Sequence, residues 1–223
     1  MLIMRCWKFI SYFSTLILCA GCYGYYHLNV SRPEAQHSPI KIDSNGVVSL
    51  NDVRLALRPS NRVEISYGAV VVGVKSDTSI EPNRKSAYYP GDLRRGPLDY
   101  FYVELMLETH LSDVKLLPDQ IFLIKKNGER VAPASYLAPL EAYGKYNYGL
   151  DLCKPNLEKI RSLQGTILLP PNVQNCLAIR YNTSFIPPEE AFSIEVQGLT
   201  IDGVRVVVPK INFSFAEFDL AHN

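Results

Sequence analysis

The sequence YFYVELMLETH, which runs from Tyr100 to His110, is the clearest strand of the chain and indicates its fold class. Apolar side chains recur at every second position from Phe101 to Leu107, whereas the row from Tyr102 to Glu108 mixes polar and apolar types. A repeat of two residues is that of a β-strand. A mixed second row is typical of an antiparallel sheet with one face on the core. We therefore expect one face of this strand to be buried and the other to be half wet.

Further strands are predicted on both sides of this stretch. Two dipeptides between β-runs, Asn127-Gly128 and Asp202-Gly203, predict hairpins with type I′ turns, in which both central residues have positive φ. Residues 134–152 read as an irregular, Tyr-rich segment. The other predicted strands are 53–59, 63–74, 121–125, 129–132, 165–169, 176–181, 192–196, 199–201, 204–208 and 211–215.

One short helix is predicted over residues 155–163. Leu157, Ile160 and Leu163 recur at a spacing of three, and Pro155 can open a helix. No series of helices alternates with the strands, which argues against a parallel sheet. The sequence predicts an all-β fold, an antiparallel two-sheet β-sandwich with immunoglobulin-like architecture and one short helix. A partly open β-barrel is the alternative.

The N-terminal segment has the pattern of a secretory signal. Arg5 and Lys8 precede an apolar run over residues 9–18, and the small residues Ala20 and Gly21 follow it. The run is shorter than the roughly 20 apolar residues that a membrane span needs. The predicted organisation is a signal peptide over 1–21, a flexible, proline-broken linker over 22–45, a single β-sandwich domain over 46–218 and a tail over 219–223.

The end of this segment resembles the signal of bacterial lipoproteins. Ala20, Gly21 and Cys22 match its lipobox, with Cys19 at the position where leucine is usual. The resemblance implies that Cys22 becomes the diacylated N-terminus of an exported protein. It also implies a membrane anchor in the cell envelope, with the domain in the periplasm or on the cell surface. The alternatives are an ordinary secretory peptide that leaves Cys22 as a free thiol, and an uncleaved anchor helix.

Two further cysteines remain if Cys22 is lipidated. Cys153 and Cys176 then form an even pair in a compartment that permits oxidation. A bridge between them would close a loop of about 24 residues and contribute roughly 3 kcal/mol. The alternative is two separate buried thiols.

The net charge and the motifs of the chain limit the classes of function that it can have. Loss of residues 1–21 takes Arg5 and Lys8 from the 23 basic side chains and leaves 21 against 22 acidic ones, a net charge of −1. A near-neutral chain without a Lys/Arg block predicts no nucleic-acid partner. Glu104 and Glu108 lie about 13 Å apart on one strand, too far for a glycosidase pair. His110 reads as a residue at the rim of a sheet. We therefore predict no catalysis, no cofactor and no metal site.

Aromatic and basic loop residues are the candidate partner-binding positions. Tyr and Arg give large contact areas with a polar group, and loops on a rigid sandwich are common binding sites. The alternative is that the Tyr rings cap the ends of the sandwich. The candidate residues are Tyr88, Tyr89, Arg94, Arg95, Tyr143, Tyr146 and Tyr148.

The C-terminal third resembles immunoglobulin-type domains of secreted bacterial lipoproteins. Residues 186–188, 192–196 and 198–209 carry this likeness as a Pro-containing segment, an alternating strand and a hairpin with Gly at its turn. We expect a lipid-anchored envelope protein that acts as a structural or protein-interaction module, with other envelope proteins as partners. A glycan- or peptide-binding module that uses the Tyr/Arg loops is the first alternative, and a hydrolase on a β-scaffold is the second.

Overall fold

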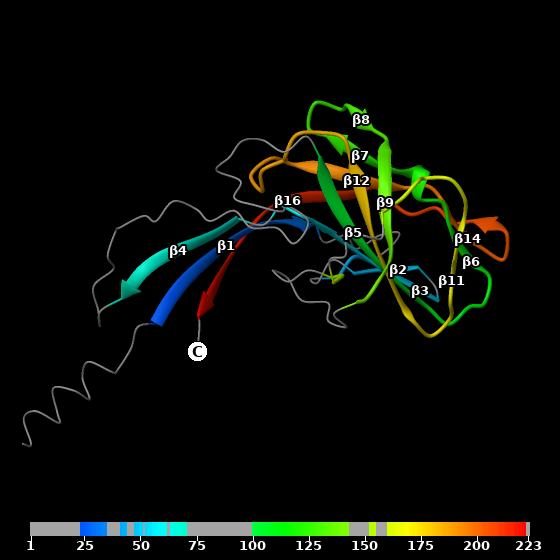
Figure 1. Cartoon of the computed structure of the whole chain (residues 1–223), viewed down its shortest axis with the longest axis horizontal. Coiled ribbons are helices and arrows are strands. Elements are labelled where there is room, and N and C mark those ends of the chain that lie inside the picture. The colour runs from blue at the N-terminus through cyan, green and yellow to red at the C-terminus, as the bar shows by residue number, and fades with distance from the viewer. Residues whose placement is uncertain are drawn as a thin grey trace, which may run out of the picture.

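The computed structural model describes residues 23–34, 41–43, 47–50, 52–61, 63–70, 100–142, 152–154 and 160–221. Within these ranges the chain forms sixteen strands and one 3-10 turn, η2 (Pro118–Gln120), and it forms no α-helix (Figure 1). The helix predicted over 155–163 is wrong where it can be compared, because Ile160–Arg161 is strand β10. Residues 155–159 lie outside the described ranges.

The strands pair into three antiparallel sheets. Sheet A has the order β4 (Val63–Val70), β1 (Tyr23–Pro33), β16 (Ile211–Ala221), β13 (Phe192–Val196), β7 (Ile121–Lys125) and β8 (Arg130–Val131). Sheet B has the order β10, β9 (Pro133–Leu140), β12 (Gln174–Tyr181), β5 (Phe101–Thr109), β3 (Val53–Pro59) and β2 (Val47–Leu50). Sheet C has the order β11 (Ile167–Leu169), β6 (Val114–Leu116), β14 (Leu199–Ile201) and β15 (Val204–Arg205).

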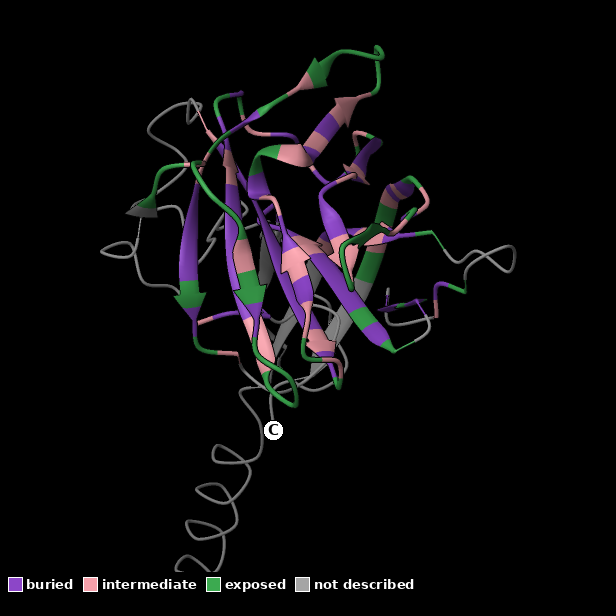
Figure 2. Ribbon diagram, turned by 90° about the vertical axis from the view of Figure 1, so that its right-hand side faces the viewer, coloured by how far each residue is buried: buried purple, intermediate pink, exposed green. Residues whose placement is uncertain are grey.

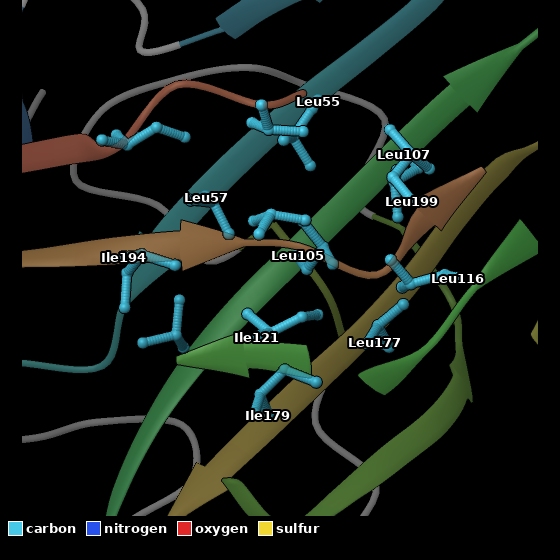
Figure 3. Close-up of a cluster of buried hydrophobic side chains, with 14 of the residues drawn as sticks. Leu55, Leu57, Leu105, Leu107, Leu116, Ile121, Leu177, Ile179, Ile194 and Leu199 are labelled. Atoms are coloured by element: carbon cyan, nitrogen blue, oxygen red, sulfur yellow. The ribbon is translucent and has the colours of Figure 1, made fainter. Parts of the chain in front are cut away.

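The sheets pack as two layers around one apolar core, which confirms the predicted sandwich. Sheet B is one layer, and its Leu105 and Leu177 face Ile121 and Ile194 of sheet A and Leu199 of sheet C (Figure 3). No sheet closes on itself within the described ranges, so the alternative of a partly open barrel is wrong.

The second layer is divided into two sheets, A and C. This division was not predicted from the sequence. The chain passes from β6 to β7 through Leu117–Gln120 and from β13 to β14 through Gln197–Gly198. These two crossings are joined, because Leu117 N–H donates to Gly198 O at 2.9 Å and Gln197 N–H donates to Gln120 O at 2.9 Å. A Cβ at Gly198 would lie 2.5 Å from Leu117 O, so only glycine allows this approach.

Both faces of β5 are buried, contrary to the prediction of a half-wet face. Glu104 is 1% exposed, and Met106 is fully buried. A second apolar cluster, which includes Val47 and Leu152, lies on this face. Buried residues run along the central strands of the sandwich, while exposed residues gather in the turns (Figure 2). The alternation of side chains predicted the strand, but segments distant in the sequence cover its second face.

The predicted linker is in large part folded, which corrects the predicted domain boundaries. Residues Tyr23–Pro33 form β1, which pairs with β16 on one side and with β4 on the other. Ile42 is 1% exposed, and β16 continues to Ala221, into the predicted tail. β1, β4 and β16 form a ribbon that extends from the sandwich (Figure 1). The linker was predicted from the polar, proline-containing residues 31–39, and the pairing of β1 with β16 joins opposite ends of the chain.

The two predicted hairpins both form, with different turns. Asp202 and Gly203 have φ angles of 49° and 75°, which confirms a type I′ turn between β14 and β15. At the other hairpin Gly128 has a φ of 84° but Asn127 has no positive φ. That connection is a longer loop, in which Asn127 Oδ1 accepts a hydrogen bond from Glu129 N–H at 2.9 Å.

The segment predicted as irregular over 134–152 contains most of β9. Pro133 and Pro139 obscured this strand in the sequence, since proline is rare inside sheets and marks bulges. The structure agrees with that rule, because the register of β9 against β12 shifts between Cys176 and Ala178.

Candidate functional site

The structure describes two of the predicted site residues, Cys153 and Cys176. They form a disulfide with a Cα–Cα distance of 5.7 Å, which confirms the predicted pairing. The other predicted site residues lie outside the described ranges: Cys22, Tyr88, Tyr89, Arg94, Arg95, Tyr143, Tyr146 and Tyr148.

The disulfide joins β12 to the segment that follows β9. Cys176 lies in β12, whereas Cys153 pairs with Ala142 in an isolated β-bridge. Next to this bridge Lys154 N–H donates to Glu141 O at 2.7 Å, and the two side chains form an ion pair. The bridge, the hydrogen bond and the disulfide therefore hold the base of the intervening segment against sheet B.

A buried carboxylate contacts the same segment. Glu104 of β5 accepts a hydrogen bond on Oε2 from Leu152 N–H at 2.5 Å. This hydrogen bond offsets part of the cost of burying the polar side chain of Glu104, which is 1% exposed. Met106, two residues further along β5, lies opposite Cys176. Glu104 therefore fixes the segment from β5, next to the point where the disulfide fixes it from β12.

Three side chains interact at the other end of this face. Burial raises the pKa of Tyr102, the positive charge of Arg180 lowers it in part, and Tyr100 raises it further. The guanidinium of Arg180 lies 4.9 Å from the ring centroid of Tyr100, a distance typical of a cation–π contact. Tyr100, Tyr102 and Arg180 thus form one cluster of electrostatic and cation–π contacts.

The path of the chain through the two layers creates a groove at the edge of the sandwich. β9 lies between β10 and β12 in sheet B, yet the chain connects β10 to β12 through β11 in sheet C. The connection therefore runs from one side of β9 to the other by way of sheet C. Residues of β9, β10, β11 and β12 line a groove here, which we call the edge groove.

The edge groove is apolar and large enough for a ligand or a peptide side chain. Its volume is about 510 Å³, within the range usual for small-molecule sites. Its walls come from both layers, and Cys176 of the disulfide is among its lining residues. The apolar walls include Ala138, Leu140, Ile167, Leu169 and Leu177.

Apolar side chains at the rim of the edge groove face solvent. Leu168 is 57% exposed and Val173 is 50% exposed, although both belong to the groove lining. Arg161 of β10 is the cation at the groove, accompanied by the amides of Gln174 and Asn175. The groove thus combines exposed apolar surface with one positive charge.

Hydrogen bonds fix the turn between β11 and β12, which forms one wall. Asn175 Nδ2 donates to Pro170 O at 3.2 Å and to Val173 O at 3.0 Å. Asn172 has a φ of 58°, and its N–H donates to Thr109 O at 2.7 Å. His110, exposed at the end of β5 as predicted, lies 2.6 Å from Asn172 Oδ1 through Nδ1. These hydrogen bonds therefore hold the wall in one conformation.

Sequence reasoning did not single out the edge groove. A strand was predicted over 165–169, and its residues Ile167, Leu168 and Leu169 are apolar at three consecutive positions. When one face of a strand is exposed, every second side chain lies in solvent. Three consecutive apolar residues therefore indicate an exposed apolar side chain, and this pattern could have pointed to the groove. The layer that covers β9 depends on the crossover from sheet B to sheet C, which no local pattern records.

The described residues were compared with the requirements of metal sites and of membrane-spanning helices. In the described part of the chain, no group of three or more His, Cys, Asp and Glu side chains is placed to hold a metal ion. No described helix is both long enough and apolar enough to cross a membrane.

Comparisons with known proteins give one structural likeness. No protein-family model matches the chain. No curated protein matches it either. Among solved structures, the chain is similar to an uncharacterized beta-sandwich protein from Clostridium difficile 630, with a TM-score of 0.32 and 12% sequence identity. The match covers 78% of this chain and 96% of that one.

Proposed function

We propose that this chain is an envelope protein anchored to a membrane through a diacylated Cys22, and that its β-sandwich is a protein-interaction module. The observation that carries the interaction role is the edge groove with Leu168 and Val173 exposed at its rim. Large apolar side chains that face solvent around a pre-formed groove are typical of binding surfaces. The module presents this surface on a sandwich stiffened by the Cys153–Cys176 disulfide.

The anchor rests on the lipobox-like sequence Ala20-Gly21-Cys22. In such a protein β1 would begin one residue after the lipid, because its first residue is Tyr23. The anchor would then connect to sheet A through a paired strand instead of a flexible spacer. This arrangement would limit how far the edge groove can reach from the bilayer surface.

Fatty-acid labelling tests the anchor. Cells that produce the full-length protein are grown with radiolabelled palmitate, and a Cys22→Ser variant serves as the control. We expect label in the wild-type protein and none in the variant, because the thiol of Cys22 carries the diacylglycerol. Label that persists in Cys22→Ser would contradict the anchor at this residue.

Site-specific photo-cross-linking tests the interaction role in the same cells. We place p-benzoylphenylalanine at Leu168 in one strain and at Val207, which is 81% exposed outside the groove lining, in another. Discrete cross-linked products from position 168 that are absent from position 207, and that disappear when Val173→Asp is added, are expected. Equal products from both positions would mean non-specific surface contact and would refute the role of the groove.

A further inference from the structure

We infer that the edge groove binds an extended polypeptide segment that pairs with β11, inserts an apolar side chain between β9 and β11, and presents a carboxylate to Arg161. This inference rests on the proposed interaction role and names the chemistry of the partner. Three features of the described residues carry it: the apolar slot, the edge of sheet C, and an unpaired cation.

The slot specifies an apolar side chain. Ala138 of β9 and Leu169 of β11 both line the slot, and Leu169 is 1% exposed. Transfer of an apolar side chain from water into such a slot is favourable by about 1.5–3 kcal/mol. Leu168 and Val173 extend this apolar surface outside the slot, so a bound segment would also cover them.

The edge of sheet C specifies an extended backbone. β11 pairs with β6 on one side and is the terminal strand of its sheet in the described chain. A terminal strand presents backbone N–H and C=O groups that can pair with an added strand. A hydrocarbon chain fills a slot but supplies no such groups, so the edge favours a polypeptide over a small amphiphile.

Arg161 specifies the charge of the segment. Several cations of the described chain have carboxylate partners, as Arg54 has in Glu108 and Arg130 has in Glu195. Arg161 lines the groove, is exposed, and has no ion-pair partner among the described residues. A guanidinium binds a carboxylate through two parallel hydrogen bonds, which gives orientation as well as affinity.

A panel of fluorescein-labelled synthetic hexapeptides tests the inference on the purified full-length, oxidised protein. Each peptide carries Val, Leu or Ile at alternate positions and ends in either Asp or Asn. Binding is measured by fluorescence anisotropy, and each peptide has a version with N-methylated backbone amides as a control. We expect Asp-terminated peptides to bind, and N-methylation to abolish binding because it removes the donors for β11.

Variants of the protein assign the contacts. Leu168→Asp should weaken binding by about tenfold or more, whereas the matched Val207→Asp outside the groove should leave it unchanged. Arg161→Gln should equalise the affinities for Asp- and Asn-terminated peptides. Circular dichroism on each variant checks that the sandwich is intact.

Several outcomes would overturn the inference. These are the absence of binding across the panel at millimolar peptide, equal binding of the N-methylated peptides, and a preference for Asp that survives Arg161→Gln. Binding of decanoate in place of the peptides would show that the groove accepts a small amphiphile. If the peptides fail while cross-links form at position 168, the chemistry of the segment is wrong and the interaction role stands. If the peptides bind while position 168 yields no specific cross-link, the interaction role in cells is wrong.

Discussion

Both faces of β5 are buried over most of their length, but they are held by different interactions. The inner face packs against the other layer of the sandwich with apolar side chains such as Phe101 and Leu105. The outer face carries Glu104 and lies under Leu152 and Cys153, next to the disulfide. One face thus depends on close packing, and the other on a covalent bond and polar contacts to a segment from elsewhere in the chain.

This difference has a physical basis in the layer structure. The inner face meets a whole sheet, so a large apolar area is buried and no specific link is needed. The outer face is covered by only a few residues around Leu152. These residues bury less apolar area relative to the conformational entropy that they lose on folding. The Cys153–Cys176 cross-link and the hydrogen bond from Leu152 N–H to Glu104 supply additional stability. Four substitutions can test this contrast, in order of decreasing expected effect.

The largest effect is expected from Phe101→Ala on the inner face. The ring of Phe101 is fully buried, with its centroid 5.7 Å from that of Phe192. Its removal leaves a cavity and should lower the free energy of unfolding by about 4 kcal/mol. Urea denaturation measures the loss, and Phe101→Leu is the control, with a loss of about 1 kcal/mol. A loss for Phe101→Ala as small as that for Phe101→Leu would contradict close packing on this face.

The second effect is expected from removal of the disulfide under the outer face. A Cys153→Ser, Cys176→Ser double variant should lose about 3 kcal/mol, because the unfolded chain regains the entropy of a closed loop. Reductant should lower the stability of the wild-type protein to that of the double variant and leave the variant unchanged. If reductant destabilises Phe101→Ala less than the wild type, the two faces are coupled and the contrast weakens.

The third effect is expected from Glu104→Ala. The substitution leaves Leu152 N–H without its acceptor and should cost about 2 kcal/mol. Glu108→Ala is the matched control on the same strand, because Glu108 pairs with the half-exposed Arg54 and contributes about 0.5 kcal/mol. Thermal or urea unfolding compares the two. Equal losses would show that the buried carboxylate does not hold the covering segment.

The smallest effect at neutral pH is expected from Tyr181→Phe, which removes a polar link across the inner face. Tyr181 is fully buried, and its hydroxyl donates to Ile121 O at 2.9 Å. Loss of this hydrogen bond should cost about 1 kcal/mol.

The same residue predicts how stability depends on alkaline pH. Burial raises the pKa of Tyr181, so the folded protein keeps a proton that the unfolded chain releases above about pH 10. Because the folded state then binds more protons, the free energy of unfolding should fall as pH rises above that value. In Tyr181→Phe this fall should be shallower. Identical pH dependence of the two proteins between pH 9 and pH 11 would contradict a raised pKa of Tyr181 in the folded state.

The elements that the sequence predicted are those whose signal is local. The alternation around Leu105 predicted β5, and Asp202-Gly203 predicted the turn between β14 and β15. The pairing of Cys153 with Cys176 followed from the count of cysteines and is also confirmed.

The elements that the sequence missed depend on distant partners. β1 pairs with β16, β9 contains two prolines, and the split of the second layer depends on the approach of Gly198 to Leu117. The edge groove is of the same kind, because residues of β9, β10, β11 and β12 line it together. Alternation within one segment specifies a strand and its two faces, but not what covers each face.

The pairing of β1 with β16 also determines the order in which this protein can fold. β1 is the first described strand to be synthesised and β16 the last, and they align from Tyr25 opposite Ala221 to Pro33 opposite Phe213. Contacts so distant in sequence make folding slow and keep strand edges open in the meantime. One edge of β1 can pair with β4, but its other edge has to wait until nearly the whole polypeptide is synthesised. We therefore expect a chain truncated before Ile211 to aggregate, even though all strands of sheet B are already present.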